Sequence, residues 1–406
     1  MINVDSTIQS PTSLGSREAA ELLGVKAQTL YAYASRGLLR RVGEGKRRRY
    51  LLEDVERLRT RQRARSGHGP VAAAALSFGE PVLDTSISAI DERGPLYRGR
   101  PAVELAASGS SFESVAELLW TGELPETAPL WQALDAPPRG WGPARTSFEE
   151  LMLALPALAL AAPTRHSRAR DVELTLARRL LRSLALLLVP PQARRGSGSI
   201  AALLSSGCKV PAKEAQHALD LALVLLAEHE LNASSFACRI AASTDANLLA
   251  CLTAALATLS GPRHGGACDR VEALLDEAEA LPRPETVLEK RNRRGDPLPG
   301  FGHPVYPHGD PRAAALLACA DALGRLRTSG KKRLAPALAL AKVMQRQGLP
   351  PTVDFGLVAL TRALGMPAGS AALLFALGRS AGWVAHVLEQ RSSEVVLRPR
   401  ARYLGG

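Results

Sequence analysis

This 406-residue sequence has few aromatic side chains, few cysteines and no apolar run long enough to cross a bilayer. Phe, Trp and Tyr together make up 4% of the chain, so helices in its core must approach one another through small residues. The five cysteines lack the paired spacing of a metal site, and an odd, scattered set favours a reducing compartment over a disulfide framework. An aliphatic run such as 184–191 is too short for a membrane span. The N-terminus lacks the apolar core of a secretory signal, so we expect a cytoplasmic protein.

Positive charge is concentrated at the N-terminal end of the chain. Residues 1–70 hold 14 Lys and Arg against 7 Asp and Glu, whereas the rest of the chain is nearly balanced. This segment therefore supplies +7 of the total charge of +12. A compact basic module joined to a nearly neutral body is typical of a nucleic-acid-binding domain fused to a second domain.

The basic module has the pattern of a winged helix-turn-helix. Residues 14–24 predict a short helix with a serine N-cap and a glycine at its end, and 27–37 predict a second helix after a tight turn. Residues 38–52 predict a hairpin with a basic tip and second arm, and 53–65 predict a charged helix. This order resembles the MerR-like and excisionase-like DNA-binding family over about fifty residues. A module that only packs or dimerises is the alternative.

The resemblance implies that the second helix faces the major groove of duplex DNA while the wing contacts phosphates. The residues expected at this interface are Gln28, Thr29, Tyr31, Arg36, Arg47, Arg48 and Arg49. We place the winged helix-turn-helix domain at 1–65. Charged, small and glycine residues without clear periodicity predict a linker at 66–79.

The remainder of the chain, residues 80–406, predicts a mostly α protein. Ala- and Leu-rich runs with helical spacing recur between Gly and Pro breaks, at 172–188, 213–231, 245–260 and 370–390. Alternating strand patterns are scarce, and the exception, 80–91, predicts an extended or hairpin segment.

Four polar residues lie where apolar helices break. His264 lies in the turn "GPRHGGA", His303 lies in a second Gly- and Pro-rich turn, "GFGHPVY", and His229 lies at a predicted helix end. Asp354 lies just before an apolar helix. Each residue alone also fits a structural role: a surface turn residue, a partner of a helix C-terminus, or an N-cap.

Together and in order, these segments resemble the citrate synthase family. The matching stretches are "DTSISAIDERGPLYRGRPAVELA", "HELNASSFACRIAAST", "GPRHGGA", "GFGHPVY" with "DPR", "TVDF", "GRSAGWVAHVLEQ" and "RPRARYLG". They span roughly 80–405. The resemblance implies an all-helical citrate synthase fold with a large and a small domain, the small one at roughly 210–315, and a homodimer.

The resemblance also implies a reaction. Acetyl-CoA would condense with oxaloacetate in a Claisen-type step, and citryl-CoA would be hydrolysed to citrate and CoA. Asp354 would remove the methyl proton while His264, held neutral by the backbone N–H groups of its turn, donates a hydrogen bond to the thioester oxygen. His303 would polarise the ketone and protonate the new alkoxide. Neither a metal nor another cofactor is expected.

Oxaloacetate carries two carboxylates, which guanidinium groups bind through paired hydrogen bonds. The resemblance assigns this binding to His229, Arg312, Arg379 and Arg398, with the last supplied by the partner subunit. The basic run at 290–294 either meets the phosphates of CoA or is a solvated charge run.

Departures from the family's usual motifs lie on the acyl-CoA side. Arg263 replaces a leucine, Cys268-Asp269 replace Asn-Glu, and Pro304 replaces an arginine. Propionyl-CoA, giving 2-methylcitrate, is therefore an alternative substrate. A different alternative is a DNA-binding transcriptional regulator whose synthase-like body senses oxaloacetate or an acyl-CoA. The full set of expected catalytic residues favours the enzyme, because a sensor need not keep the base.

Overall fold

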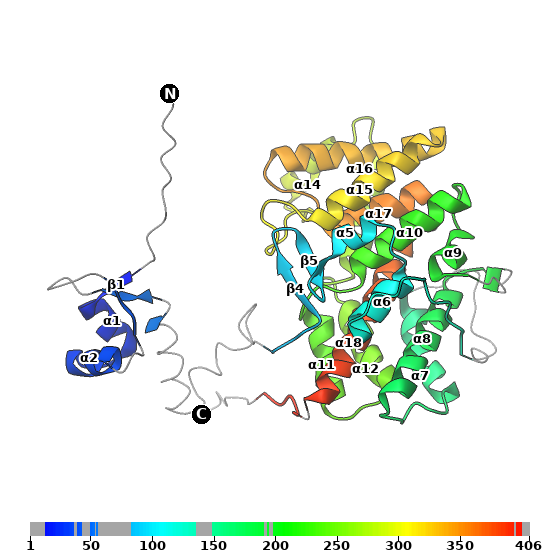
Figure 1. Ribbon diagram of the computed structural model, residues 1–406. Helices are drawn as coiled ribbons and strands as arrows, with labels where there is room; N and C mark the ends of the chain where they lie inside the picture. The colour runs from blue at the N-terminus through cyan, green and yellow to red at the C-terminus, as the bar shows by residue number, and fades with distance from the viewer. Residues whose placement is uncertain are drawn as a thin grey trace, which may run out of the picture. The chain divides into compact units, whose positions relative to one another are not determined.

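The computed structural model describes residues 13–35, 39–42, 49–52, 54–55, 83–134, 148–190, 193–194, 198–393 and 395–399. The density of internal contacts divides the chain into two units. One unit, the N-terminal unit, contains Met1–Asp84 and Arg398–Gly406, and the other, the body, contains Thr85–Leu397 (Figure 1).

Two short helices of the N-terminal unit confirm the predicted helix-turn-helix. They are α1 (Ser16–Leu23) and α2 (Ala27–Ser35), separated by Gly24, whose φ of 63° is the left-handed conformation typical of a helix end. Leu23 and Leu30, one from each helix, are buried in the small core of this unit. Burial of these side chains holds the two helices together.

A small antiparallel sheet completes the described part of this unit. β2 (Arg41–Val42) pairs with β3 (Arg49–Leu51), which confirms the predicted hairpin. β1 (Ser13–Gly15) pairs with the other edge of β3, a strand that the sequence did not predict. Most of the charged helix expected at 53–65 and all of the linker expected at 66–79 lie outside the described residues.

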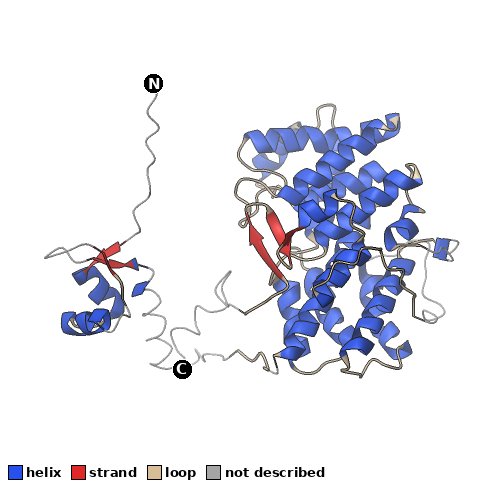
Figure 2. Cartoon of the chain, in the orientation of Figure 1, coloured by secondary structure: helices blue, strands red, loops and turns tan. Residues whose placement is uncertain are grey.

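The body is almost wholly helical (Figure 2). Its helices are α5 (Ala102–Ala107), α6 (Phe112–Thr121), α7 (Phe148–Ala161), α8 (Arg170–Leu187), α9 (Ile200–Ser205), α10 (Ala212–Leu226), α11 (Ala233–Ser243), α12 (Leu248–Leu259), α13 (Ala267–Glu279), α14 (Thr286–Arg294), α15 (Pro311–Arg325), α16 (Thr328–Arg346), α17 (Val353–Leu364) and α18 (Ser370–Ser392). The segment expected to be extended or a hairpin contributes β4 (Ser88–Asp91), which pairs with β5 (Gly94–Tyr97), and β5 pairs with β6 (Arg100–Pro101).

Helix α18 is the central helix of the body. It is long and apolar enough to cross a membrane, but 94% of its most apolar window is buried inside the protein, so it is a core helix. Two glycines let it approach the end of α10 closely. A Cβ at Gly378 would lie 2.9 Å from Cβ of Leu226, and one at Gly382 would overlap the carboxylate of Glu228. The backbones of α18 and the end of α10 therefore touch.

The predicted helix at 213–231 ends earlier than its periodicity indicates. α10 stops at Leu226, and the buried hydroxyl of Tyr97 lies 3.0 Å from the carbonyl oxygens of Val224 and Glu228. The backbone N–H of Glu228 donates to the same hydroxyl at 3.1 Å. A side chain more than a hundred residues away thus satisfies the last carbonyls of the helix and turns the chain into the site.

Candidate active site

His264 lies in the tight turn between α12 and α13. The two glycines after it are needed for space, because a Cβ at Gly265 would lie 2.6 Å from the side chain of Leu259. A Cβ at Gly266 would lie 2.9 Å from the carbonyl oxygen of Ser260. These close approaches fix the turn, and with it the direction of the imidazole.

The imidazole of His264 is held from both sides. Its Nε2 lies 2.8 Å from the hydroxyl of Ser234, which also accepts the indole N–H of Trp383 at 3.1 Å. On the other side the ring meets Phe375 edge-on, with 6.3 Å between ring centroids. Burial, and after it the charge of Arg379, lower the pKa of His264 to about 4, so the ring is neutral near pH 7. Our expectation that the backbone N–H groups of the turn hold it neutral named the wrong cause.

Backbone pairing holds the His303 loop against the start of α17. The N–H of Gly302 donates to Pro350 and the N–H of Thr352 donates to Gly300, both at 2.9 Å. Gly300 has a φ of 87°, which favours glycine, and a Cβ there would lie 2.7 Å from Val271. The positions of His303 and Asp354 are therefore fixed relative to each other, although they are distant in sequence.

The surroundings of His303 determine which nitrogen carries its proton. Its Nδ1 accepts the backbone N–H of Val305 at 3.1 Å, so the neutral ring is protonated at Nε2. Burial, and then the charge of Arg312, lower the pKa of His303. A neutral His303 can therefore donate a hydrogen bond through Nε2.

Asp354 is the second residue of α17, and its helix is capped by Thr352. It thus lies inside the helix rather than just before it, and it is not the N-cap. The thiol of Cys268 donates to its Oδ1 at 3.5 Å, and the hydroxyl of Thr352 lies 3.4 Å from its Oδ2. Burial raises the pKa of Asp354, an effect that Cys268 and Arg312 partly offset. A carboxylate with few strong donors in a buried position is a good proton acceptor.

Arg312, Tyr306, His229 and His303 form one cluster. Arg312 lies in the first turn of α15, 1% exposed, and makes two hydrogen bonds of 3.0 and 2.8 Å with Asp310. Its guanidinium lies 5.5 Å from the ring centroid of Tyr306, whose hydroxyl is 2.9 Å from Nε2 of His229. The rings of His229 and His303 meet edge-on at 5.8 Å. Burial and the two nearby arginines, Arg312 and Arg379, lower the pKa of His229 well below its usual range.

Arg379 connects this cluster with His264. It is 2% exposed, its Nε donates to the carbonyl of Leu226 at 2.8 Å, and its guanidinium lies 5.1 Å from the centroid of Phe375, the ring that also meets His264. Burial lowers the pKa of Arg379, while the carboxylate of Glu228 counters this effect. The guanidinium is therefore a buried cation with one end fixed on α10.

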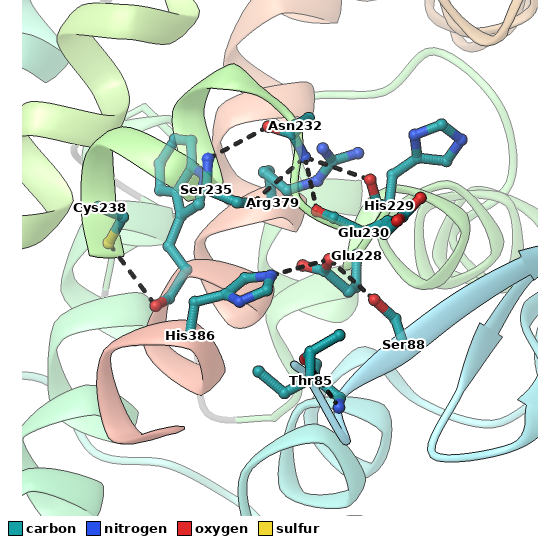
Figure 3. Close-up of polar contacts among 12 residues, drawn as sticks. Thr85, Ser88, Glu228, His229, Glu230, Asn232, Ser235, Cys238, Arg379 and His386 are labelled. Carbon is teal, nitrogen blue, oxygen red and sulfur yellow. Dashed lines mark hydrogen bonds and ion pairs between the residues drawn. The ribbon is translucent and has the colours of Figure 1, made fainter. Parts of the chain in front are cut away.

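A fully buried polar network lies beneath His229 (Figure 3). The carboxylate of Glu228 accepts from the hydroxyl of Ser88 and lies 3.1 Å from Nε2 of His386, so α18 and β4 are both joined to the residue before His229. Glu228 and His386 are each 0% exposed. This network, together with Tyr97, fixes the backbone from which His229 projects.

The described body thus brings together six of the seven residues predicted for catalysis and substrate binding. They are His229, His264, His303, Arg312, Asp354 and Arg379. Two buried guanidiniums and three neutral imidazoles form a cluster whose charge and donors suit a small dianion, with a buried carboxylate nearby. Within the described residues, no group of three or more His, Cys, Asp or Glu side chains is placed to hold a metal ion.

The seventh predicted residue, Arg398, belongs to the other unit. It is exposed, it follows the end of α18, and it is grouped with the N-terminal unit rather than with the body. The role of Arg398 stays a prediction.

The residues predicted to bind DNA are placed only in part. Gln28 and Tyr31 are exposed on α2, Thr29 is half-buried on the same helix, and Arg49 is exposed on β3. Arg36, Arg47 and Arg48 lie outside the described residues.

Sequence reasoning missed several residues that build the site. Tyr306, Ser234, Phe375 and Trp383 all lie within or beside the motifs that were recognised, but no role was given to them. For Tyr306 and Ser234 the available signal was a polar side chain inside a turn motif. The partners of these side chains are 30 to 149 residues away in sequence, so spacing alone could not reveal them.

Two family models match the chain. Residues 77–400 match the C-terminal domain of citrate synthase, and residues 13–63 match a helix-turn-helix domain. Among solved structures, the body resembles the citrate synthase of the archaeon Thermoplasma acidophilum, determined as a ternary complex with carboxymethyl coenzyme A and oxaloacetate. The TM-score is 0.69 at 26% identity, and the match covers 81% of this chain and 95% of that one.

Curated relatives match in two ways. Citrate synthase 2 of Bacillus subtilis is 36% identical over 189 residues, which are 46% of this chain, so the chain spans only half the length (50%) of that relative. Citrate synthase of Haloferax volcanii is 30% identical, over 80% of this chain and 93% of that protein. A 2-methylcitrate synthase of Shewanella oneidensis is 29% identical over 81% and 93%. The matches therefore include enzymes named for two different acyl groups.

Proposed function

The chain belongs to the citrate synthase family, and we propose that it condenses an acyl-CoA with oxaloacetate and releases CoA. The observation that carries the proposal is the cluster in which Arg312, Arg379 and His229 lie beside His303, with His264 and Asp354 close to the arginines. The Thermoplasma citrate synthase with a similar fold was solved with oxaloacetate and a coenzyme A analogue, which supports the same pair of ligands here.

In this proposal Arg312 and Arg379 bind the two carboxylates of oxaloacetate. Both side chains are already held by protein contacts, Arg312 by Asp310 and Arg379 by the carbonyl of Leu226. Little side-chain entropy is then lost on binding, and the remaining N–H groups are preorganised for the substrate. Neutral His229 adds a donor or acceptor without adding a charge.

Proton transfer begins the reaction. The carboxylate of Asp354 takes a proton from the α-carbon of the acyl thioester, and the electron pair moves onto the thioester oxygen. His264 stabilises this oxygen through Nδ1–H, which requires its Nε2 to accept the hydroxyl proton of Ser234. Ser234 has two acceptors in reach, His264 at 2.8 Å and Asn232 at 2.7 Å, so this proton distribution is available.

Carbon–carbon bond formation follows. The enolate carbon attacks the ketone carbon of oxaloacetate, the thioester carbonyl is restored, and His303 donates the proton on Nε2 to the oxygen that becomes the alcohol. The orientation of this proton follows from the Nδ1 contact with Val305. Water then cleaves the citryl-type thioester to the free acid and CoA. His303 and Asp354 recover their starting protonation states through solvent.

The acyl group is tested by one assay. We expect release of free thiol when purified protein is mixed with oxaloacetate and either acetyl-CoA or propionyl-CoA, and the larger kcat/KM identifies the substrate. The acetyl compound is the leading candidate, and relatives named for citrate and for 2-methylcitrate make both arms necessary. No release with either thioester, from protein that still binds oxaloacetate, would refute the enzyme and favour the sensor.

We also propose that the active protein is a cytoplasmic homodimer in which Arg398 of one subunit completes the site of the other. The support is chemical: a segment carrying an exposed arginine follows α18, and a dicarboxylate site gains from a third guanidinium. Sedimentation of the full chain tests the oligomeric state.

A second function is proposed for the N-terminal unit. The match to a helix-turn-helix domain at residues 13–63 and the +7 charge of residues 1–70 favour binding of duplex DNA. A dimer would then favour a palindromic site with half-sites about one helical turn, or a multiple, apart. Selection from a random duplex library at physiological salt tests this, because a domain that reads no sequence enriches none. A regulator that senses oxaloacetate would bind DNA differently with and without that ligand.

A further inference from the structure

We propose that Cys268 is a positioning residue for Asp354: its buried thiol donates a weak hydrogen bond that holds the carboxylate in place yet leaves it a strong proton acceptor. The inference rests on the proposed function, because it concerns the group that would take the proton from the acyl-CoA. In this role Cys268 helps to set the pKa of Asp354, in a site whose other proposed residues are histidines and arginines.

The geometry joins the beginnings of two packed helices. Cys268 is the second residue of α13 and Asp354 is the second residue of α17, and these two helices pack against each other. Sγ of Cys268 lies 3.5 Å from Oδ1 of Asp354. The other oxygen has a long contact, 3.4 Å, with the hydroxyl of Thr352, and the carboxylate also accepts the backbone N–H of Asp354 itself. The thiol of Cys268, which lies on a different helix, therefore fixes the orientation of the Asp354 carboxylate.

The thiol keeps its proton at neutral pH. Cys268 is 1% exposed, and burial raises its pKa well above the usual value, with the carboxylates of Asp354, Asp269 and Glu272 adding to the effect. A thiolate beside a catalytic carboxylate is thereby avoided. Cys268 acts only as a donor toward Asp354.

The titratable and charged groups that face Asp354 come from three other elements. They are Cys268 on α13, Asp310 and Arg312 at the start of α15, and Arg379 on α18. Arg312 is neutralised in part by its own two bonds to Asp310, so its pull on Asp354 is reduced. Arg312 donates to Asp310 and Arg379 donates to the carbonyl of Leu226, so the donor at position 268 directly affects the pKa and orientation of the Asp354 carboxylate.

The strength of that donor sets the basicity of the carboxylate. When Asp354 takes the proton from the α-carbon, it loses its negative charge, and every hydrogen bond to the carboxylate weakens. A strong donor therefore opposes the transfer, while no donor leaves the carboxylate free to turn. A thiol is a weaker donor than a hydroxyl or an amide. It combines a defined orientation with a small loss of proton affinity.

A series of donors at position 268 tests the proposal. For Cys268→Ala, the parent, Cys268→Ser and Cys268→Asn, the acid limb of kcat/KM for the acyl-CoA is measured at saturating oxaloacetate. We expect the midpoint to fall in that order, by about 0.5 pH unit per step, and the KM for oxaloacetate to stay unchanged. Equal midpoints in all four proteins, or midpoints that do not follow the order of donor strength, would overturn the proposal. Should the Asn variant not fold, the Ala and Ser variants still bracket the parent.

A second measurement separates this proposal from the proposed function. Infrared difference spectra during a pH titration show the carboxyl band of Asp354, which is identified by its absence in Asp354→Asn. The same order of midpoints is expected without any acyl-CoA. If neither thioester is turned over, the proposed function fails. The order of the infrared midpoints among the variants still tests whether Cys268 sets the pKa of Asp354. Cys251→Ala serves as the matched control, because this buried thiol of α12 bonds the carbonyl of Ala246, and its removal should leave the midpoint unchanged.

Discussion

The two units of the chain hold their candidate functional residues in opposite ways. In the body, Arg312 and Arg379 are almost completely buried and their guanidiniums are fixed by protein contacts. In the N-terminal unit, Gln28, Tyr31 and Arg49 lie on the outside of a small fold with a core of a few side chains. The body is thus suited to enclosing a small anion, and the N-terminal unit to meeting a large one at its surface.

The difference teaches how charge should be interpreted in each unit. Buried arginines are costly unless a carboxylate or a ligand compensates them; Arg312 is paired with Asp310, whereas Arg379 donates to a backbone carbonyl, so the pair retains positive charge that a small anion would compensate. An excess of exposed Lys and Arg costs little and indicates a polyanion only together with a suitable fold. In the body, the placement of the buried side chains indicates the class of ligand. In the N-terminal unit, the class of ligand is inferred from the sequence pattern and the excess of positive charge. The experiments below test whether the two units are as independent as this contrast implies.

The largest effect is expected from replacing the buried carboxylate of Asp354 in the body by an amide. Asp354→Asn removes the base while keeping the shape of the side chain. Turnover should fall by about 100- to 10,000-fold, because proton abstraction from the α-carbon loses its acceptor. Oxaloacetate binding, measured by titration calorimetry, should be unchanged. Near-normal turnover would show that Asp354 does not act as the base.

The next largest effect is expected from removal of the N-terminal unit. Deleting residues 1–65 should abolish selection of any duplex sequence and leave kcat within about twofold of the full chain, because the six clustered site residues lie in the body and the deletion keeps Arg398. Binding of the full chain to DNA should weaken steeply with salt as counterions are released. A truncated protein that loses condensation as well would break the contrast between the units.

The contrast also explains what the sequence could predict. The winged helix-turn-helix order, the helical body and the catalytic turns follow from local signals: glycine at a helix end as at Gly24, or a polar residue in a turn as at His264 and His303. These signals lie within a few residues of one another. The N-terminal unit, built from short local elements, is therefore well predicted where it is described.

Contacts between distant segments could not be predicted in this way. The hydroxyl of Tyr97 ends α10 more than a hundred residues away, and the indole of Trp383 reaches Ser234 across 149 residues. The thiol of Cys268 reaches Asp354 across 86 residues. Such partners depend on how whole helices pack, and a single sequence carries no spacing that specifies them. The expected role of Arg398 in the partner subunit's site depends on a contact with a second chain, which spacing within one sequence does not specify either.

Mixing two inactive chains tests the one exposed residue that is predicted to join a buried site. Arg398→Ala and Asp354→Asn chains should each be inactive alone. If Arg398 acts in the partner's site, random mixed dimers contain one site with both residues intact, and activity should return to about a quarter of the parent. Verified mixed dimers without any recovery would exclude a contribution across the dimer.

The smallest effect is expected at a buried carboxyl remote from the pocket. Glu113 on α6 is 1% exposed, and one of its oxygens accepts the backbone N–H of Ile200 at 2.6 Å, at the start of α9. Burial raises the pKa of Glu113 to about 7, and burial likewise raises the pKa of Asp220, which accepts the backbone N–H of Phe112 at the start of α6, to about 6. The folded protein therefore binds these protons more tightly than the unfolded chain does, and its stability should fall as pH rises from about 4.5 through 7.

Glu113→Gln keeps an acceptor oxygen for Ile200 and cannot ionise. It should raise the free energy of unfolding at pH 8 by about 1–3 kcal/mol and leave it nearly unchanged at pH 4.5, so the decline with pH becomes shallower. Urea unfolding at the two pH values measures this, with the exposed Glu104→Gln on α5 as the control. Turnover should stay at the parent value, because no pocket residue contacts Glu113. A variant that is less stable at pH 8 would mean that the hydrogen bond to Ile200 needs the full negative charge, and that buried charge in the body contributes to folding as well as to ligand binding.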